Sequence, residues 1–351
     1  MKLNDVIKRI PHWYASGKSI YLKSPPGRGK TTTLVHASVQ LSKMLGKNLG
    51  HVVINGPLLT PGDALGYLIP KHFESHSESI YTDPFWFRTK DGKRLGEYDG
   101  GVIIVDEADK MDTDVKKVIG EAALSGRLGP HQLKGGWVIW MAGNRAQDRS
   151  GSTKELDHLI NRRMEIDVHD DLQSWLDWAA ANDVLPLTQA FAAQNPHIVF
   201  TDKTPDKQGP WCTPRSLIGS DEYIRVVTPD GNIPDDPLLK EEVAGMIGEG
   251  ATAQYFAFVK LAREMPKFES IIKEPEKVKV PEKPDAQMLV VFNLAHRVDG
   301  NTIGPVIKYV ERMPKEFAIT FTKSATKRAP DLVIHPDMRA WYMQNASLLA
   351  A

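Results

Sequence analysis

The chain has 351 residues, 41% of them apolar, which is enough to build the cores of two domains. Its 44 basic side chains equal its 44 acidic ones, unlike the basic footprint of a dedicated nucleic-acid-binding protein. The only cysteine, Cys212, excludes an internal disulfide and favours a reducing compartment. Charges interrupt the N-terminal stretch where a signal peptide would be apolar, and no window reaches the length of a membrane span. We therefore expect a cytoplasmic protein without a membrane segment.

The first motif in chain order is GRGKT, residues 27–31, in the stretch KSPPGRGKTTTL. It is the core of a phosphate-binding loop, although the full pattern has Gly where Ser24 stands. Glycines allow successive N–H groups to point at phosphate oxygens, Lys30 can bridge the β- and γ-phosphates, and Thr31 offers a hydroxyl to Mg²⁺. An ordinary Gly-Pro turn is the alternative. The apolar strand before the loop and the helical pattern after it favour nucleotide binding.

Apolar strand candidates alternate with helical patterns through the first half of the chain. The strands are predicted over residues 20–22, 51–54, 102–105, 137–141 and 164–168, and a helix over 31–45. This alternation predicts an α/β fold with a mainly parallel sheet between helices. Ligands of such sheets bind at the carboxyl ends of the strands, where the motifs below also fall.

Residues 56–100 form a long irregular segment between the second and third predicted strands. Asp91-Gly92 is a hairpin signal within it. The aromatic run 85–87 either packs in a core, which we favour, or grips a substrate in a pore. His72 and His76 have the spacing of one helix face, but a loop is favoured over a metal site.

Strand signals fade after residue 168, and helical patterns replace them. We expect an α/β nucleotide-binding domain over residues 1–168 and a mainly α-helical domain over 169–351. The stretch 273–285 is rich in proline and charge and is typical of an extended connector.

Polar residues follow two of the apolar strands. VIIVDE places Asp106 and Glu107 directly after a buried strand, where Asp106 can bind Mg²⁺ and Glu107 can take a proton from an attacking water. Asn144 follows the next strand, and an amide can orient that water and contact a phosphate at once. The alternatives are a solvated strand end for the carboxylates and an ordinary turn for Asn144.

Arginines occur where they could neutralise a γ-phosphate. Arg162 and Arg163 lie between a helix and the last strand, and Arg215 follows Pro214 at a helix start in the helical domain. The alternative for each is a solvated surface arginine.

In this order the motifs resemble those of the AAA+ ATPases, and within them the MoxR-like and dynein-related group. The resemblance implies a Walker B pair (Asp106 and Glu107), a sensor 1 residue (Asn144), an arginine finger (Arg162 or Arg163) and a sensor 2 residue (Arg215). It assigns the nucleotide-binding loop to Ser24, Pro25, Pro26, Gly27, Arg28, Gly29, Lys30, Thr31 and Thr32, with Thr31 and Asp106 at the Mg²⁺. The segment 56–100 is similar to an insert of that group.

The resemblance implies an ATP hydrolase that uses ATP and Mg²⁺, assembles as a homo-oligomeric ring, expected to be a hexamer, and remodels a protein partner. Similar proteins often work beside a von Willebrand A-domain protein. Two alternatives stay open: a nucleic-acid motor or GTP-using restriction-type relative, which the neutral charge argues against, and a nucleotide-dependent switch, which Glu107 argues against.

Overall fold

The computed structural model describes residues 1–148, 157–161, 163–169, 171–202, 205 and 208–346. The chain divides into two compact units, Met1–Asp170 and Asp171–Ala351, which are described separately below. The division lies close to the boundary predicted at residue 168.

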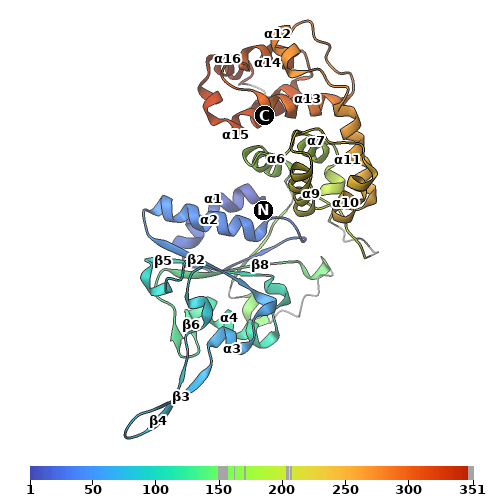
Figure 1. The fold of residues 1–351 in the computed structure, drawn as a ribbon. Coiled ribbons are helices and arrows are strands. Elements are labelled where there is room, and N and C mark those ends of the chain that lie inside the picture. Colours follow the sequence, from blue (N-terminus) through green and yellow to red (C-terminus); the bar gives the residue numbers. More distant parts are fainter. Residues whose placement is uncertain (149–156, 162, 170, 203–204, 206–207, 347–351) are drawn as a thin grey trace. The chain divides into compact units, whose positions relative to one another are not determined.

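The first unit alternates strands and helices along the chain (Figure 1). Its α-helices are α1 (Leu3–Ala15), α2 (Lys30–Leu45), α3 (Pro61–Leu65), α4 (Thr113–Ser125) and α5 (Asp157–Ile160). Its strands are β1 (Ile20–Lys23), β2 (Leu49–Asn55), β3 (Leu68–His72), β4 (Ser77–Tyr81), β5 (Gly100–Asp106), β6 (Arg127–Leu128), β7 (His131–Gln132), β8 (Trp137–Gly143) and β9 (Met164–Asp167). Short 3-10 turns are η1 (Gly56–Leu58), η2 (Phe85–Phe87), η3 (Leu95–Glu97), η4 (Ala108–Lys110) and η5 (Ala146–Asp148).

Five strands form one parallel sheet in the order β2-β5-β8-β1-β9. These are the five strands predicted from the sequence; β1, β2, β5 and β8 are longer than predicted by one to three residues, and β9 ends one residue earlier. The spatial order differs from the chain order, so β8 lies between β5 and β1. Because the strands are parallel, their carboxyl ends all lie at one edge of the sheet. At that edge the end of β8 lies between the ends of β5 and β1.

The two faces of the sheet bury alternate residues of each strand, as a pleated strand requires. Ile20 and Leu22 pack against α1 and α2 together with Val102 and Ile104, whereas Tyr21 faces the core that holds α4. Figure 1 shows α1 and α2 on one side of the sheet and α4 on the other. The predicted sheet with helices on both faces is confirmed.

The segment between β2 and β5 carries a hairpin that the sequence did not predict. β3 and β4 pair antiparallel, from Leu68 opposite Tyr81 to His72 opposite Ser77, and the hairpin extends away from the sheet (Figure 1). Asp91-Gly92 is a tight turn, with Gly92 at φ 84°, but only a single bridge pairs its flanks. The hairpin prediction was therefore right about the turn and wrong about regular strands there.

Helices are the only regular secondary structure among the described residues of the second unit. Its helices are α6 (Leu172–Ala181), α7 (Pro186–Gln194), α8 (Pro196–Val199), α9 (Pro214–Val227), α10 (Pro237–Ile247), α11 (Glu249–Ala262), α12 (Phe268–Lys273), α13 (Pro284–Arg297), α14 (Ile303–Val310), α15 (Lys315–Arg328), η6 (Pro330–Ile334) and α16 (Pro336–Gln344). Gly248, at φ 81°, separates α10 from α11. A side chain does not fit at this position, because a Cβ there would lie 2.7 Å from the carbonyl oxygen of Pro210.

Two hydrophobic clusters fill this unit. The first helical cluster surrounds Phe191 and Tyr255, and the second surrounds Phe321 and Trp341. α13 belongs to both clusters: Leu289 and Phe292 are in the first, and neighbouring residues of the same helix are in the second.

The connector predicted over 273–285 is confirmed, because the residues between α12 and α13 form neither helix nor strand, but it is not a free linker. Arg312 donates hydrogen bonds to the carbonyl oxygens of Pro275 (2.6 Å) and Val278 (2.8 Å), and the Tyr309 hydroxyl donates to that of Lys279. Val278 also packs against the second helical cluster. Prolines exclude regular structure here, but side chains from α14 and the turn after it hold the segment against the helices.

Among the described residues, no helix combines the length and the apolar character needed to cross a membrane.

Candidate functional site

The loop between β1 and α2 has the backbone geometry of a phosphate-binding loop. Gly27 and Gly29 have φ values of 76° and 74°, in the left-handed region that glycine adopts at low cost. Gly29 is the N-cap of α2 and no side chain caps that helix end. Because glycine has no side chain, the N-cap residue supplies no acceptor to the first N–H groups of α2, and such a helix end suits an anionic ligand.

Ser24 fits at the position where the full pattern has glycine. Its φ is not positive, so a side chain causes no strain there. The Ser24 hydroxyl donates to the carbonyl oxygen of Pro25 at 3.0 Å and accepts from the Lys30 ammonium at 3.0 Å. The serine therefore supports the loop through its own hydrogen bonds.

Lys30 is the first residue of α2 and is 7% exposed. Its ammonium donates to the carbonyl oxygens of Ser24 (3.0 Å) and Pro25 (3.1 Å), and to Oδ1 of Asn144 (3.2 Å). Buried ammonium groups need such partners. The cation is thus held inside the loop and beside the end of β8.

Thr31 and Asp106 meet across the site. The Thr31 hydroxyl donates to Asp106 Oδ1 at 2.6 Å, and the backbone N–H of Glu107 donates to the same oxygen at 2.9 Å. A hydroxyl and a carboxylate are the hard oxygen ligands that Mg²⁺ prefers. These residues fit a magnesium ion, which would supply charge neutralisation at the phosphates.

Glu107 has an unusual backbone conformation, with φ 51° and ψ 37°. A non-glycine residue in the left-handed region carries strain, which proteins tend to keep at functional sites. Its side chain is 40% exposed and accepts a hydrogen bond from Lys110 at 2.9 Å. The strained residue is the one whose type and position predict a general base.

Asn144 directly follows β8 and is 9% exposed. Because β8 lies between β5 and β1, its polar end faces both the acidic strand end and the loop. Its backbone N–H donates to Oδ1 of Asp109 at 3.0 Å, and its Nδ2 to Oδ2 at 3.4 Å. The structure thus brings Lys30, Thr31, Asp106 and Asn144 together, as the sequence predicted.

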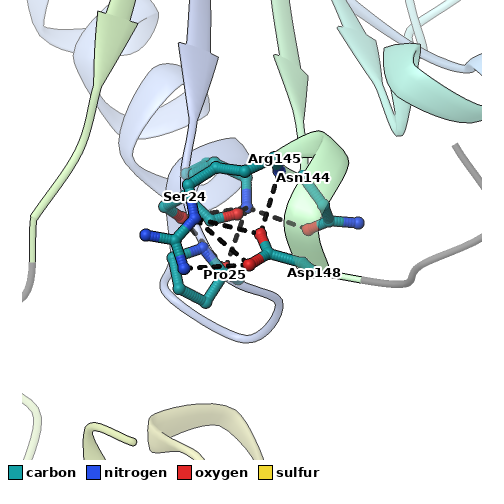
Figure 2. A network of polar contacts seen from close by, with 6 residues as sticks. Ser24, Pro25, Asn144, Arg145 and Asp148 are labelled. Carbon is teal, nitrogen blue, oxygen red and sulfur yellow. Dashed lines mark hydrogen bonds and ion pairs between the residues drawn. The ribbon is translucent and has the colours of Figure 1, made fainter. Parts of the chain in front are cut away.

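Two further residues of the site were missed from the sequence. Arg145 and Asp148 lie beside Ser24, Pro25 and Asn144 in Figure 2, and the Arg145 guanidinium donates to Asp148 at 2.8 Å. Asp148 also accepts from the backbone N–H of Arg145 at 2.9 Å. An Arg and an Asp at i, i+3 just after a strand end are the only signal that could have marked them.

Arg163 is held inside the first unit. Its guanidinium donates to Glu165 at 2.8 Å and lies 4.3 Å from the centre of the Tyr21 ring, and its side chain is 7% exposed. Lys23, the last residue of β1, also donates to Glu165. The structure thus gives Arg163 partners in its own unit. Arg162 lies outside the described residues, and the arginine-finger assignment stays a prediction.

Arg215 lies in the first turn of α9, which begins at Pro214 as predicted, behind a capping box of Thr213 and Ser216. Its side chain is exposed. It belongs to the second unit, and its assignment as sensor 2 stays a prediction.

The two histidines lie in and beside the β3–β4 hairpin. His72 ends β3 and contacts Ser77 at 2.8 Å, and His76 stacks on Phe73. No group of three or more metal-ligating side chains occurs among the described residues.

The aromatic run 85–87 is buried only in part. Trp86 is 1% exposed in the core of the first unit, whereas Phe85 is 64% exposed. The aromatic run therefore packs in a core at Trp86 and does not do so at Phe85.

Comparison with protein-family models found no match, and comparison with curated proteins found none either. Among solved structures, the chain is similar to a RuvB mutant from Thermotoga maritima, at 15% identity over 77% of this chain and 74% of that one, with a TM-score of 0.38. It is also similar to NtrX from Brucella abortus in complex with ADP, at 15% identity over 98% of this chain and 68% of that one, with a TM-score of 0.37. Likeness at these scores carries no argument about function.

The fold class follows from the chain's own topology. A parallel five-stranded sheet between helices, a glycine loop between β1 and α2, and an acidic end on β5 give the first unit the fold of the AAA+ P-loop NTPases. A mainly helical unit follows it, as the sequence predicted.

Proposed function

We propose that this chain binds and hydrolyses ATP. The observation that carries the proposal is the meeting of Lys30, Thr31, Asp106 and Asn144 at the carboxyl edge of one sheet, next to strained Glu107. Each side chain has a distinct task there. Lys30 would hold the β- and γ-phosphates, Thr31 and Asp106 would hold Mg²⁺, and Asn144 would orient the attacking water.

In the proposed reaction the oxygen of that water attacks the γ-phosphorus, and Glu107 accepts a proton from the water. The bond from phosphorus to the β–γ bridging oxygen breaks, and the products are ADP and inorganic phosphate. Removal of one general base typically slows such a step by about 10²–10⁴-fold.

We further propose that the chain belongs to the MoxR-like and dynein-related group and works as a homo-oligomeric ring, expected to be a hexamer. The long segment between β2 and β5, with its hairpin, supports the group assignment by resemblance. A protein partner, of which a von Willebrand A-domain protein is one candidate, would be remodelled at the expense of ATP.

Turnover of ATP and GTP, each with and without DNA, tests the activity and its alternatives. We expect ATP hydrolysis that DNA does not stimulate, and Glu107→Gln should bind ATP with parental affinity while losing turnover by roughly a hundredfold or more. Stimulation by DNA, or a preference for GTP, would favour the nucleic-acid motor or the restriction-type relative. Tight nucleotide binding without any turnover would favour a switch.

A further inference from the structure

Asp109, two positions after Glu107, is held against Asn144. It lies in η4, is 2% exposed, and uses both carboxylate oxygens on one residue. Oδ1 accepts from the Asn144 backbone N–H at 3.0 Å, and Oδ2 accepts from its side-chain Nδ2 at 3.4 Å. Asp109 is therefore bonded to the backbone and the amide of the residue predicted to orient water.

The end of β8 leaves room for this contact. A Cβ on Gly143 would lie 2.8 Å from Asp109 Oδ1 and 2.3 Å from the Tyr21 hydroxyl oxygen. Gly143 does not have a positive φ, so it is space, not backbone conformation, that requires glycine. On its other side Asp109 accepts, through its carbonyl oxygen, a hydrogen bond of 3.3 Å from the buried ammonium of Lys116.

These contacts distinguish the two orientations of the Asn144 amide. Its Oδ1 accepts from the Lys30 ammonium at 3.2 Å while Nδ2 donates to Asp109. A flipped amide would set Nδ2 against the ammonium and Oδ1 against the carboxylate, which pairs donor with donor and acceptor with acceptor. In the observed orientation an amide retains a second N–H and a second oxygen lone pair.

We propose that Asp109 is a positioning residue for ATP hydrolysis, which holds the Asn144 amide so that it can donate to the γ-phosphate and accept from the attacking water. Asp109 touches neither group and acts through Asn144. This inference rests on the proposed function and adds a residue to it.

Asp109→Asn tests the inference, because it keeps the shape of the side chain but replaces one acceptor by a donor. We expect ATP affinity within about threefold of the parent in a direct titration, and a kcat lower by roughly ten- to a hundredfold, as for a misplaced transition-state donor. Asp112→Asn is the matched control. It makes the same charge change at the exposed N-cap of α4, where Asn caps as well as Asp, and should leave both values unchanged.

A double-mutant cycle separates positioning from general support of the fold. In an Asn144→Ala background, Asp109→Asn should lower kcat no further, because the group through which it acts is gone. Equal losses of kcat in both backgrounds would overturn the inference, as would parental kcat in Asp109→Asn. If Asp109→Asn does not fold, Asp109→Ser, which is smaller and keeps one acceptor, takes its place with the same expectations.

ATP turnover by the parent protein distinguishes failure of the positioning role of Asp109 from failure of the proposed ATP hydrolysis. If the parent hydrolyses ATP and Glu107→Gln does not, a parental kcat in Asp109→Asn overturns the positioning role alone. If the parent does not hydrolyse ATP, both proposals fall.

Discussion

Lys30 places a cation within hydrogen-bond distance of two carbonyl oxygens of its own loop. A phosphate would meet the same charge in the ground state, before any reaction. Lys30→Ala should therefore weaken ATP binding itself, by about ten- to a hundredfold, as loss of one charged hydrogen-bonding group predicts. Isothermal titration checks this. Lys43→Ala, in the exposed last turn of the same helix, is the control and should bind ATP like the parent; equal affinity of Lys30→Ala would mean that the loop is only a turn.

Glu165 makes the stability of the first unit depend on pH. Burial acts to raise the pKa of its carboxyl, but hydrogen bonds from Lys23 and Arg163 outweigh burial and hold that pKa below its usual value. A depressed folded-state pKa contributes stability that is present above the unfolded value, about 4.3, and is lost as pH falls through the folded value. Arg163→Ala should cost about 1–3 kcal/mol of unfolding free energy at pH 7 and less at pH 3.5.

Urea unfolding at the two pH values measures this difference, with Arg9→Ala on the exposed side of α1 as the control. The same loss at both pH values would show that Arg163 does not depress the pKa of Glu165.

Asp106 and Asn144 could be predicted as site residues from the sequence. Each is a polar residue directly after an apolar strand, and both the residue type and the strand are visible in the sequence. Asp109 and Asp148 could not be predicted in this way. Their acceptor oxygens serve backbone N–H groups of residues 144 and 145, and for Asp109 that partner is 35 positions away. The pairing of β8 with β5 brings it within reach, and no local pattern encodes that pairing.

At the scale of elements, β2 and β5 each have a glycine at the same register position, where there is no space for a side chain. Gly50 pairs with Gly101, and a Cβ on Gly101 would lie 2.2 Å from the Gly50 carbonyl oxygen and 2.7 Å from the Trp137 ring. Gly101→Ala should therefore overpack the sheet and cost about 1–3 kcal/mol of unfolding free energy. Chemical denaturation measures it. Gly96→Ala, where nothing lies within 4 Å of the added Cβ, should change far less, and equal losses would contradict the packing argument.

The elements show which patterns identify structure and which do not. β1, β5 and β8 are apolar runs buried along almost their whole length, and such runs are distinctive, whereas β2 and β9 are only partly buried. β3 is exposed at every residue and β4 at all but Ile80, so no alternation marks them, and Pro70 argues against a strand. The hairpin therefore depends on pairing between its own two strands, which composition does not reveal.

At the scale of the whole molecule, a ring would place a finger of one subunit at the nucleotide of the next. Arg162→Ala subunits should bind ATP yet fail to hydrolyse it, because the lost charge acts mainly on the transition state. Mixing them with Glu107→Gln subunits should restore some turnover, at interfaces where an intact finger meets an intact base. Turnover across mixing ratios, with size measured by light scattering, checks this. Full ATP turnover by a monomeric protein would contradict a shared site. So would mixtures that recover no turnover at any ratio, if Arg163→Ala alone loses turnover as Arg162→Ala does.

The place of α13 in both helical clusters has a mechanical consequence. A helix with Leu289 in one cluster and Val291 in the other cannot leave one cluster without disturbing the second. We expect the amides of α7 and α15 to exchange with solvent deuterium through one shared opening, with equal free energies and equal dependence on denaturant. Separate openings in native-state exchange would contradict this. With one shared opening, the two clusters would move as one rigid body. A displacement of α7 would then also displace α15, because α13 is packed in both clusters.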